Sequence, residues 1–569
     1  MLRLIHNCNK ERRIYEMKTS LIKHCMLIYW SIILMLVLAA CSGSEQSGNL
    51  SPPQPAHPIQ QSGEYKSNPD EPAWKLDTTP VDLTWFVGAN WYGHTWGESM
   101  TSKYVTEKTG VHIKFEVPSG EAGEQITLMM TSGKMPDLMT MGSWESAINK
   151  LLESDQVYAL NELAEQYDPY FFKVAGDGTL KWYRQKNGNT YGIPNDSYSP
   201  SQMQATGLTA ANQTFLVRKD LYEAMGRPDL STPEGFLNAL QLLKDQYSVY
   251  KGQLISPFFA QGTVSYGMTD YLQNLLAIPH EKDGKYNDRM TDPDYITWLK
   301  TFRTAYERGL INVDFMVDSN AQVEEKTSNA RYFMMIREWN GMAAINPILA
   351  AGAYPNSYYI AVDGPQNRHG DSATLFPGNM DGWMVTMISK STKNPERAIR
   401  FLTYLASEEG QRDVFLGKEG ATWAMRNGKP QLKADMVQLL DTDRERLEKE
   451  YGLMDTYWML RNPAFVNPWR PEKAPSVKQM EEFANKQADM DSGIYKGIDP
   501  VGDSDIALAW SRISQNWEEV LPELITAKDE AAFDKIFENF LARRVNYGFN
   551  QVMEYRQAEL DARKAKMSE

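Results

Sequence analysis

Residues 111–117 read Val-His-Ile-Lys-Phe-Glu-Val, in which apolar and polar side chains alternate without a break. This period of two is typical of a β-strand with one buried face. A similar alternation covers residues 81–87, and a short apolar run covers residues 138–141. Helical patterns separate these segments, at residues 98–109 and just before Gly133. This alternation of strands and helices predicts a parallel sheet with right-handed crossovers, and therefore an α/β fold.

Aromatic residues follow the first and third of these predicted strands. Trp91, Tyr92 and Trp96 follow residue 87, and Trp144 follows residue 141. Ligands of open α/β sheets bind at the carboxyl ends of the strands, and aromatic rings cover flat apolar ligand faces. The four side chains are therefore candidates for a binding site, although they could also fill a large core.

The later sequence predicts several helices. Thr232 followed by Pro233 has the pattern of a helix start, and a second start lies at Pro395. Residues 510–521, 530–541 and 545–564 predict a mainly helical C-terminal portion. We interpret the Met, Leu and Trp stripes on these helices as packing surfaces and not as a site.

The composition excludes several classes of protein. The chain has 569 residues, of which 42% are hydrophobic and 23% are charged, as in an ordinary globular protein. It is not collagen-like, wholly disordered or a protein with many membrane spans. The formal net charge is −14, and no basic block interrupts the sequence, so we expect no binding to nucleic acid.

The N-terminal segment has the pattern of an export signal. Lys18 and Lys23 precede an almost wholly apolar run, residues 26–40, which is short for a membrane span. The run ends in Leu-Ala-Ala followed by Cys41, which resembles the lipobox of bacterial lipoproteins. In those proteins the chain is cleaved before the cysteine, which carries lipid. We therefore predict a signal peptide at residues 1–40 and lipidation of Cys41.

Two alternatives remain open for this segment, namely a retained membrane anchor or an ordinary signal peptide. The start of translation is Met1 or Met17. Cleavage at Cys41 would leave that residue as the only thiol, so no internal disulfide would form. Residues 42–78 are rich in Ser, Gly, Gln and Pro, and we expect residues 41–78 to be a lipidated cysteine followed by a flexible tether.

Several catalytic and metal-binding motifs are missing from the sequence. It contains no CxxC, HExxH, GxSxG or P-loop pattern, and the His residues are widely scattered. With 73 Asp and Glu residues, a pair suited to glycoside hydrolysis cannot be distinguished from surface charge. These absences do not exclude an enzyme, but nothing in the sequence argues for one. We expect no cofactor, no metal and no catalytic residues.

A series of short motifs runs along the body in a characteristic order. They are Thr109-Gly-Val111, Ser132-Gly133-Lys-Met-Pro136-Asp137-Leu138, Thr190-Tyr191-Gly192-Ile193-Pro194-Asn195, Phe215-Leu-Val-Arg218-Lys-Asp220-Leu221, Thr232-Pro233-Glu234, Gly382-Trp383, Asn394-Pro395-Glu396, Ser407-Glu-Glu409-Gly410-Gln411 and Gly417-Lys-Glu419-Gly420. Their order and spacing resemble bacterial extracellular solute-binding lipoproteins of ABC importers, in the large carbohydrate-binding group. The resemblance covers residues 80–560. The calcium loop of some members is missing from the matching stretch, residues 244–254, so we predict no structural metal.

The resemblance implies a two-lobed periplasmic-binding-protein fold of type II, with hinge crossovers and a helical C-terminal portion. The crossovers are expected near residues 194–199 and 378–385. The expected first lobe comprises residues 79–195 and 384–425, and the expected second lobe comprises residues 196–383 and 426–569.

Sugars present apolar C–H faces and a rim of hydroxyls, so their sites combine aromatic rings with polar side chains. Candidates of these types occur on both expected lobes and at the crossovers. They are Trp91, Tyr92, Trp96, Trp144, Asn195, Asp196, Tyr198, Tyr266, Tyr271, Trp339, Asn340, Asp381 and Trp383.

The resemblance implies a monomeric binding protein that captures a carbohydrate, with an oligosaccharide favoured, between two lobes and delivers it to a membrane permease. A lipid anchor would hold it on the extracellular face of the membrane, and low Cys use favours a Gram-positive bacterium. Two alternatives remain. One is a secreted carbohydrate-active hydrolase or lyase. The other is a receptor for a peptide, an aminosugar or another solute, or a ligand sensor for a membrane kinase.

Overall fold

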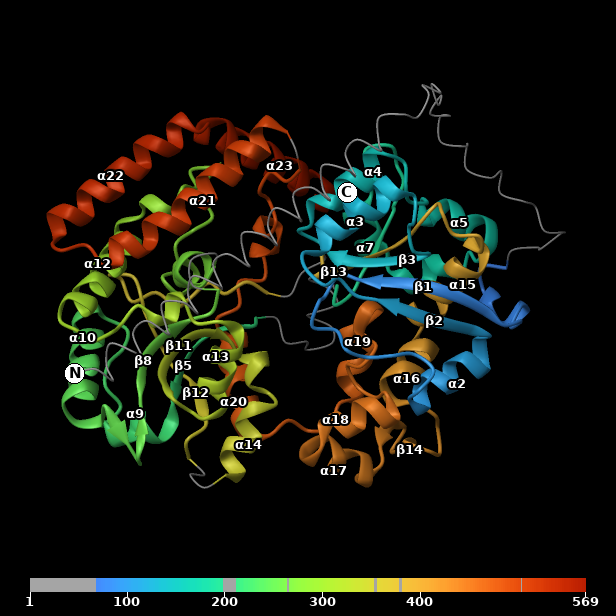
Figure 1. Ribbon diagram of the computed structural model, residues 1–569, viewed down its shortest axis with the longest axis horizontal. Helices are drawn as coiled ribbons and strands as arrows, with labels where there is room; N and C mark the ends of the chain where they lie inside the picture. The colour runs from blue at the N-terminus through green and yellow to red at the C-terminus, as the bar shows by residue number, and fades with distance from the viewer. Residues whose placement is uncertain are drawn as a thin grey trace, which may run out of the picture. The chain divides into compact units, whose positions relative to one another are not determined.

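The computed structural model describes residues 68–197, 211–262, 266–352, 356–377, 381–502 and 504–568. All of them belong to one compact unit, residues 65–569 (Figure 1). The predicted signal peptide, Cys41, most of the predicted tether and the candidate Tyr198 lie outside the described residues.

The first lobe is built on a five-stranded sheet in the order β2-β1-β3-β13-β4. β1 is parallel to β2 and β3, whereas β13 is antiparallel to β3 and β4. The structure confirms the three predicted strands and the parallel pairing between them. The strands are β1 (Val81–Val87), β2 (Val111–Glu116), β3 (Leu138–Gly142), β4 (Ile193–Pro194) and β13 (Met384–Ile388).

Helices surround this sheet. α15 and α16, which come from late in the chain, pack on α5 and α2 respectively and fill the core with the early segments (Figure 1). The helices of this part are α2 (Met100–Thr109), α3 (Ala122–Ser132), α4 (Ser146–Glu153), α5 (Leu160–Tyr167), α6 (Phe171–Ala175), α7 (Asp177–Tyr183), α15 (Pro395–Ala406) and α16 (Glu408–Leu416).

The second lobe is built on a four-stranded sheet in the order β12-β5-β11-β8. β11 is parallel to β8 and antiparallel to β5, which is antiparallel to β12. The strands are β5 (Gln213–Arg218), β8 (Ser256–Ala260), β11 (Tyr332–Glu338) and β12 (Tyr359–Ala361). Two small hairpins are formed by β6 (Val249–Tyr250) with β7 (Gln253–Leu254) and by β9 (Glu281–Lys282) with β10 (Lys285–Tyr286).

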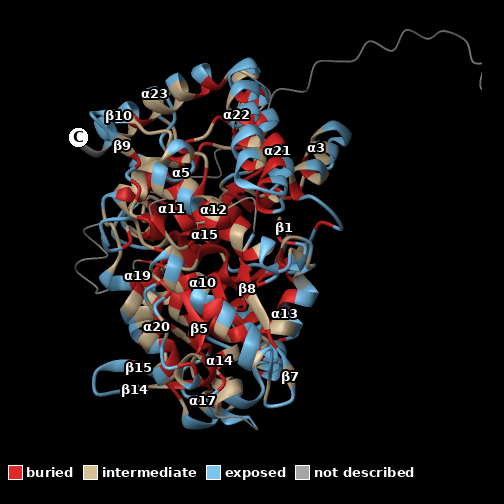
Figure 2. Ribbon diagram, turned by 90° about the vertical axis from the view of Figure 1, so that its left-hand side faces the viewer, coloured by how far each residue is buried: buried red, intermediate tan, exposed pale blue. Residues whose placement is uncertain are grey.

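The predicted helix start at Thr232 is confirmed, because its hydroxyl accepts a hydrogen bond from the Gly235 amide and Pro233 is the first helical residue. Figure 2 shows the buried residues gathered around β5 and β8, with exposed residues on outer helices such as α22. The helices are α9 (Lys219–Ala224), α10 (Pro233–Leu242), α11 (Leu272–Leu275), α12 (Pro293–Glu307), α13 (Asn320–Ser328), α14 (Ile345–Ala351), α20 (Pro475–Lys486), α21 (Asp505–Ile525), α22 (Glu530–Asn546) and α23 (Phe549–Ser568).

The packing departs from the expected lobe boundary at residue 425. Tyr457 and Trp458 belong to the same hydrophobic core as Trp85 in β1, and Trp469 packs with Phe415 of α16. These apolar side chains complete the first lobe. The elements concerned are β14 (Trp423–Arg426), β15 (Lys429–Leu432), α17 (Ala434–Thr442), α18 (Arg444–Arg446), the 3-10 helix Trp458–Leu460 and α19 (Pro463–Val466).

The predicted tether ends earlier than residue 78. Residues Ala73–Leu76 form a 3-10 helix, and the buried Trp74 ring meets Tyr404 edge-on at a centroid distance of 5.0 Å. The Ala73 amide also donates to the buried carboxylate of Asp168. The Pro-rich and Ser-rich composition hid this attachment, in which the Trp74 ring and the hydrogen bond to Asp168 both take part.

Candidate binding site

Three tryptophans come together at one edge of the first-lobe sheet. Trp91 and Trp144 follow the carboxyl ends of β1 and β3, which run parallel. Trp383 immediately precedes β13, which is antiparallel to β3, so it reaches the same edge. The backbone carbonyl of Trp383 accepts a hydrogen bond from the Ser143 amide at 3.0 Å. Sheet topology therefore brings together three candidates that lie far apart in the sequence.

Trp91 is the outermost ring of an indole stack, a name we give to Trp91, Trp383 and Trp458. Its ring stacks on Trp383 at a centroid distance of 6.3 Å and on Trp458 at 5.7 Å. Trp383 and Trp458 lie 4.6 Å apart. Trp458 is buried, Trp383 is partly buried and Trp91 is 64% exposed. The stack thus supports a large apolar face that stays open to solvent.

Trp144 presents a second exposed indole, with 61% of its surface accessible. Its ring lies against the backbone of Gly142, where an added methyl group would be 2.5 Å from the ring. Only glycine leaves room for this arrangement. The site edge therefore contains two exposed indoles, on the loops after β1 and β3.

Tyr92 and Trp96 do not reach this surface. Both are buried, and the Tyr92 hydroxyl donates to the Thr456 carbonyl at 3.2 Å. The Trp96 indole donates to Thr106 at 2.8 Å. Burial raises the pKa of Tyr92 well above its ordinary value. The expectation that these rings face a ligand is corrected by the structure, because both complete the core beside β1.

Asn195 and Asp196 mark the crossover that leaves the first lobe. Asn195 is fully buried, and its carboxamide accepts from the Met384 amide at 2.9 Å and donates to the Trp458 carbonyl at 3.4 Å. A side chain with these contacts ties the two crossovers together and does not face solvent. The backbones of the two crossovers also approach closely at Gly382, where an added methyl group would lie 2.0 Å from the Asn195 carbonyl oxygen.

Asp196 begins an ion-pair chain that contacts the indole stack at Trp383. Its carboxylate accepts from the Trp383 indole at 2.9 Å and from Arg461 at 2.7 and 2.6 Å. Arg461 also donates to Asp455 at 2.6 Å, and Arg470 donates to Asp455 at 2.7 and 3.1 Å. These paired contacts are the strong, directional geometry that guanidinium groups form with carboxylates.

The two central groups of this chain stay ionised. Burial alone would raise the pKa of Asp455, but Arg470 and Arg461 outweigh it and hold the pKa well below its ordinary value. Burial likewise opposes the charge on Arg461, yet Asp196 and Asp455 raise its pKa. The chain therefore holds fixed charges close to the stack, each of which already has a partner.

The second-lobe sheet edge has a different composition. The rings of Tyr266 and Tyr271 lie 5.1 Å apart, after the carboxyl end of β8. The Tyr271 hydroxyl donates to the Glu338 carboxylate, at the end of β11, at 2.6 Å. Burial raises the pKa of Tyr271, and the charge of Glu338 raises it further. Both candidate tyrosines thus lie at one edge of the second-lobe sheet, together with a carboxylate.

Trp339 and Asn340 differ in exposure. Trp339 is buried, its indole donates to the Ala211 carbonyl at 2.9 Å, and Lys473 lies 5.2 Å from its ring centroid. The expectation that this ring points into a cleft is therefore corrected. Asn340 is exposed, and its amide donates to the Asn212 side chain at 3.3 Å.

Asp381 lies at the return crossover, among groups from three segments. Its carbonyl accepts a hydrogen bond from the Tyr183 hydroxyl of α7, and its carboxylate lies 3.8 Å from Lys496. Burial raises the pKa of Asp381, while Lys496 and Arg563 partly offset the shift. These contacts indicate that Asp381 links the crossover to its neighbours.

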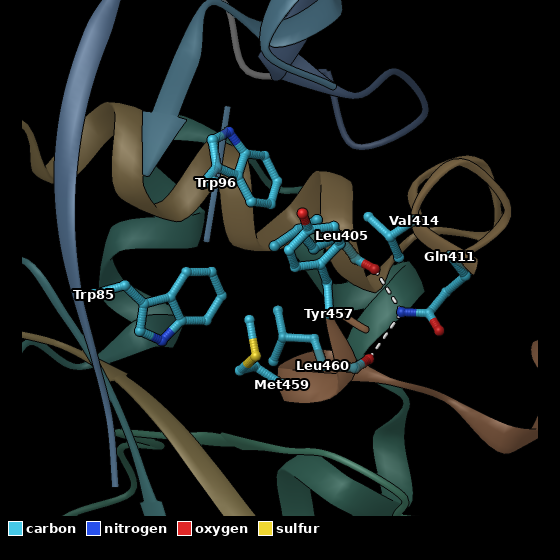
Figure 3. Close-up of a pocket in the computed structure, with 8 residues that line it drawn as sticks. All are labelled: Trp85, Trp96, Leu405, Gln411, Val414, Tyr457, Met459 and Leu460. Atoms are coloured by element: carbon cyan, nitrogen blue, oxygen red, sulfur yellow. Dashed lines mark hydrogen bonds between the residues drawn. The ribbon is translucent and has the colours of Figure 1, made fainter. Parts of the chain in front are cut away.

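A small cavity lies inside the first lobe (Figure 3). It offers about 10 Å³ to the centre of a water molecule, roughly the space that one water requires. Figure 3 shows the Gln411 amide bonded to the carbonyls of Leu405 and Leu460, at 2.6 and 2.8 Å. The cavity is thus a packing gap and is too small for a sugar.

The described part of the chain contains no group of three His, Cys, Asp or Glu side chains arranged to hold a metal ion. None of its helices combines the length and the apolar character of a membrane span.

The sequence interpretation missed Trp458 and the charges around it. The sequence shows only a short apolar run, Tyr457 to Leu460, between Asp455 and Arg461, and this pattern does not distinguish a site from a core segment. The run falls within residues 426–569, which the resemblance places in the second lobe.

Comparison with known proteins gives the family. The model of the bacterial extracellular solute-binding protein family matches residues 95–412. The chain belongs to this family. The solute-binding protein is 21% identical over 347 residues to Lipoprotein LipO of Bacillus subtilis, in an alignment that spans 58% of this chain. That alignment covers 65% of LipO, which is less than two thirds of its length.

Solved structures share the fold of the solute-binding protein at low identity. The alginate-binding protein AlgQ2 has a TM-score of 0.64 and 17% identity, covering 86% of this chain and 100% of that chain. A solute-binding protein of Bifidobacterium longum infantis, described as binding HMO, has a TM-score of 0.62 and 13% identity, with 85% and 99% covered. FusA of S. pneumoniae, in complex with kestose, has a TM-score of 0.61 and 14% identity, with 85% and 100% covered.

Proposed function

We propose that this chain is the extracellular solute-binding lipoprotein of an ABC importer, which captures an oligosaccharide between its lobes and delivers it to a membrane permease. The observation that carries the proposal is the exposed Trp91 ring on its supported indole stack, beside the exposed Trp144. Relatives described as binding alginate, HMO or kestose support a carbohydrate ligand.

The chemistry of the two sheet edges suits a sugar. The C–H face of a pyranose ring packs on an indole, which removes apolar surface from water. Hydroxyl groups at the rim of the sugar then require acceptors and donors, and Glu338 and the tyrosine hydroxyls provide both. A hydroxyl left without a partner after closure would be costly, so this arrangement would also confer selectivity.

Closure would turn on the two crossovers, near residues 194–199 and 378–385. The backbones of Asn195 and Gly382 touch there, and the Asn195 amide donates to the Met384 carbonyl at 3.0 Å. A pivot of this kind lets one lobe rotate while its own sheet stays intact.

The binding proposal is tested by thermal unfolding of the purified chain with a panel of plant and microbial oligosaccharides. A true ligand at 100 times its dissociation constant adds about 2.7 kcal/mol to the free energy of unfolding. We expect a saturable rise in melting temperature and no change in the sugar after long incubation. Steady release of product would instead support a hydrolase or lyase, and a response only to a peptide library would support the peptide receptor.

The lipid anchor at Cys41 requires a separate test. Bacteria that express the chain would be fed a clickable palmitate analogue, and we expect label on the wild type but not on Cys41→Ser. Equal labelling of both would refute the lipobox, and label on neither would favour an ordinary signal peptide. We further propose a monomer on the outer face of a Gram-positive cell membrane, which light scattering and cell fractionation would check.

A further inference from the structure

We propose that Asp196 and Arg461 are positioning residues, which fix the orientation of Trp383 and thereby form the indole stack before any ligand arrives. The purpose of this stack rests on the proposed function, but its assembly by the ion-pair chain is a property of the free protein. The test below therefore needs no ligand.

The backbone of Asp196 is held in an unusual conformation. Its φ angle is +47°, in the left-handed region that residues other than glycine rarely adopt. The Asp196 amide donates to the Arg461 carbonyl at 2.8 Å, so this conformation is fixed by the segment that also provides the guanidinium.

The carboxylate of Asp196 binds both the Trp383 indole and the Arg461 guanidinium. One oxygen accepts both the Trp383 indole N–H, at 2.9 Å, and Arg461 Nη2, at 2.6 Å. The other oxygen accepts from Arg461 Nε at 2.7 Å. Because Arg461 Nη1 is bonded to Asp455, the guanidinium cannot swing away without breaking a second ion pair. The carboxylate is thus fixed, and it fixes one edge of the indole in turn.

The orientation of Trp383 decides where Trp91 can rest. Trp383 lies 15° from parallel to Trp91 and 31° from parallel to Trp458. An indole that rotated about its side-chain bonds would lose the stacked contact with Trp91, whose ring is mostly exposed. A rigid indole stack loses less conformational freedom on ligand binding than a mobile one, which favours affinity.

A purely structural tie at the hinge is the competing explanation. Under that explanation, loss of the ion pair would lower stability without changing the environment of Trp91. A signal from each tryptophan is therefore needed, and the fluorine resonances of 5-fluorotryptophan provide it, assigned by single Trp→Phe replacements.

Asp196→Gly is the main variant, because glycine adopts positive φ freely and only the carboxylate is lost. Asp283→Gly is the matched control, since Asp283 has φ +53° in the exposed turn between β9 and β10. We expect Asp196→Gly to shift or broaden the Trp383 and Trp91 resonances and to leave Trp298, in the second-lobe core, unchanged. Asp283→Gly should change none of the three.

Asp196→Asn tests the same point without removing the side chain, because its carbonyl still accepts the indole N–H while its charge is lost. We expect a smaller shift of Trp383 than in Asp196→Gly, and Arg461→Gln should resemble Asp196→Asn. Trp383 and Trp91 resonances that stay at their wild-type positions in Asp196→Gly would overturn the proposal. If Asp196→Gly fails to fold, the same readout from Asp196→Asn and Arg461→Gln decides.

Discussion

The two sheet edges of this protein carry aromatic residues in opposite ways. At the first-lobe edge, Trp91 and Trp144 are mostly exposed. The ion-pair chain from Asp196 to Arg470 reaches Trp383 through Asp196, and its charges are already paired. At the second-lobe edge, Trp339 is buried, and partly exposed phenols lie beside the carboxylate of Glu338. One edge thus presents apolar faces and the other presents hydrogen-bonding groups.

Under the proposed function, this difference would divide the recognition of a sugar between the two lobes. Apolar faces give affinity with little directional preference, whereas hydroxyl and carboxylate groups impose geometry. If the apolar faces lie on one lobe and the hydrogen-bonding groups lie on the other, a ligand would contact both only after the lobes close. The following predictions test whether the edges differ in stability, in ligand affinity and in their response to pH.

The largest effect is expected at the centre of the ion-pair chain. Asp455→Ala leaves Arg461 and Arg470 without their shared partner in a partly buried position, and should lower the free energy of unfolding by about 3 kcal/mol. The matched second-lobe change, Glu338→Ala, removes one acceptor and should cost about 1 kcal/mol. Urea unfolding measures both, and equal losses would contradict the proposed difference between the edges.

Ligand binding should depend most on the exposed indole of the stack. Trp91→Ala is expected to weaken binding roughly 10- to 100-fold, or about 1.4–2.7 kcal/mol. The free energy of unfolding should change by only about 0.5 kcal/mol, because the ring is mostly exposed. Calorimetric titration with the best sugar from the thermal screen measures the affinity. Tyr266→Phe, which keeps its ring, is the second-lobe control and should lose less.

The contribution of the first-lobe edge to the free energy of unfolding should decrease in acid. Because the pKa of Asp455 is lowered in the folded state, its stabilisation is complete above the unfolded pKa of about 4 and is lost as the pH falls below it. The difference in unfolding free energy between wild type and Asp455→Asn should be constant above pH 5. Below pH 4 it should shrink by up to about 1.4 kcal/mol per pH unit. A constant difference down to pH 2 would show that Asp455 is not held in its charged form.

The smallest effect is expected at the second-lobe edge, and it should appear in alkali. Tyr271→Phe removes the hydrogen bond to Glu338 and should cost about 1 kcal/mol at neutral pH. The pKa of Tyr271 is raised in the folded state, so its stabilisation is present below about pH 10 and is lost as the pH rises above that value. The gap between wild type and Tyr271→Phe should therefore close above pH 10 in denaturant titrations, and a gap that widened would exclude this assignment.

Much of the fold followed from local patterns. The alternation at residues 81–87 and 111–117 predicted β1 and β2 closely, because one buried face imposes a period of two on each strand. The positions of Trp91 and Trp144 followed from the same reasoning, since parallel strands share a carboxyl edge. Their role in binding stays a prediction.

Other features could not be read from local patterns. Tyr92 follows Trp91 directly, yet one ring is buried and the other is exposed, because a loop has no fixed period. Trp458 and Arg461 contact Trp91, Trp383 and Asp196, which lie earlier in the sequence, and only tertiary packing brings them together. The attachment of Trp74 was hidden for the same reason.

Trp458 and Arg461 lie late in the sequence, and this position affects how the protein folds. Tyr92 and Thr456 are hydrogen-bonded across a sequence separation of 364, and Asp196 meets Arg461 across 265. Closing such long loops costs entropy before the contacts that reward it can form, which slows folding. A ribosome or a translocon releases residue 461 only after most of the polypeptide has emerged, so nascent chains that stop short of it cannot assemble the platform, however well β1 to β3 have formed.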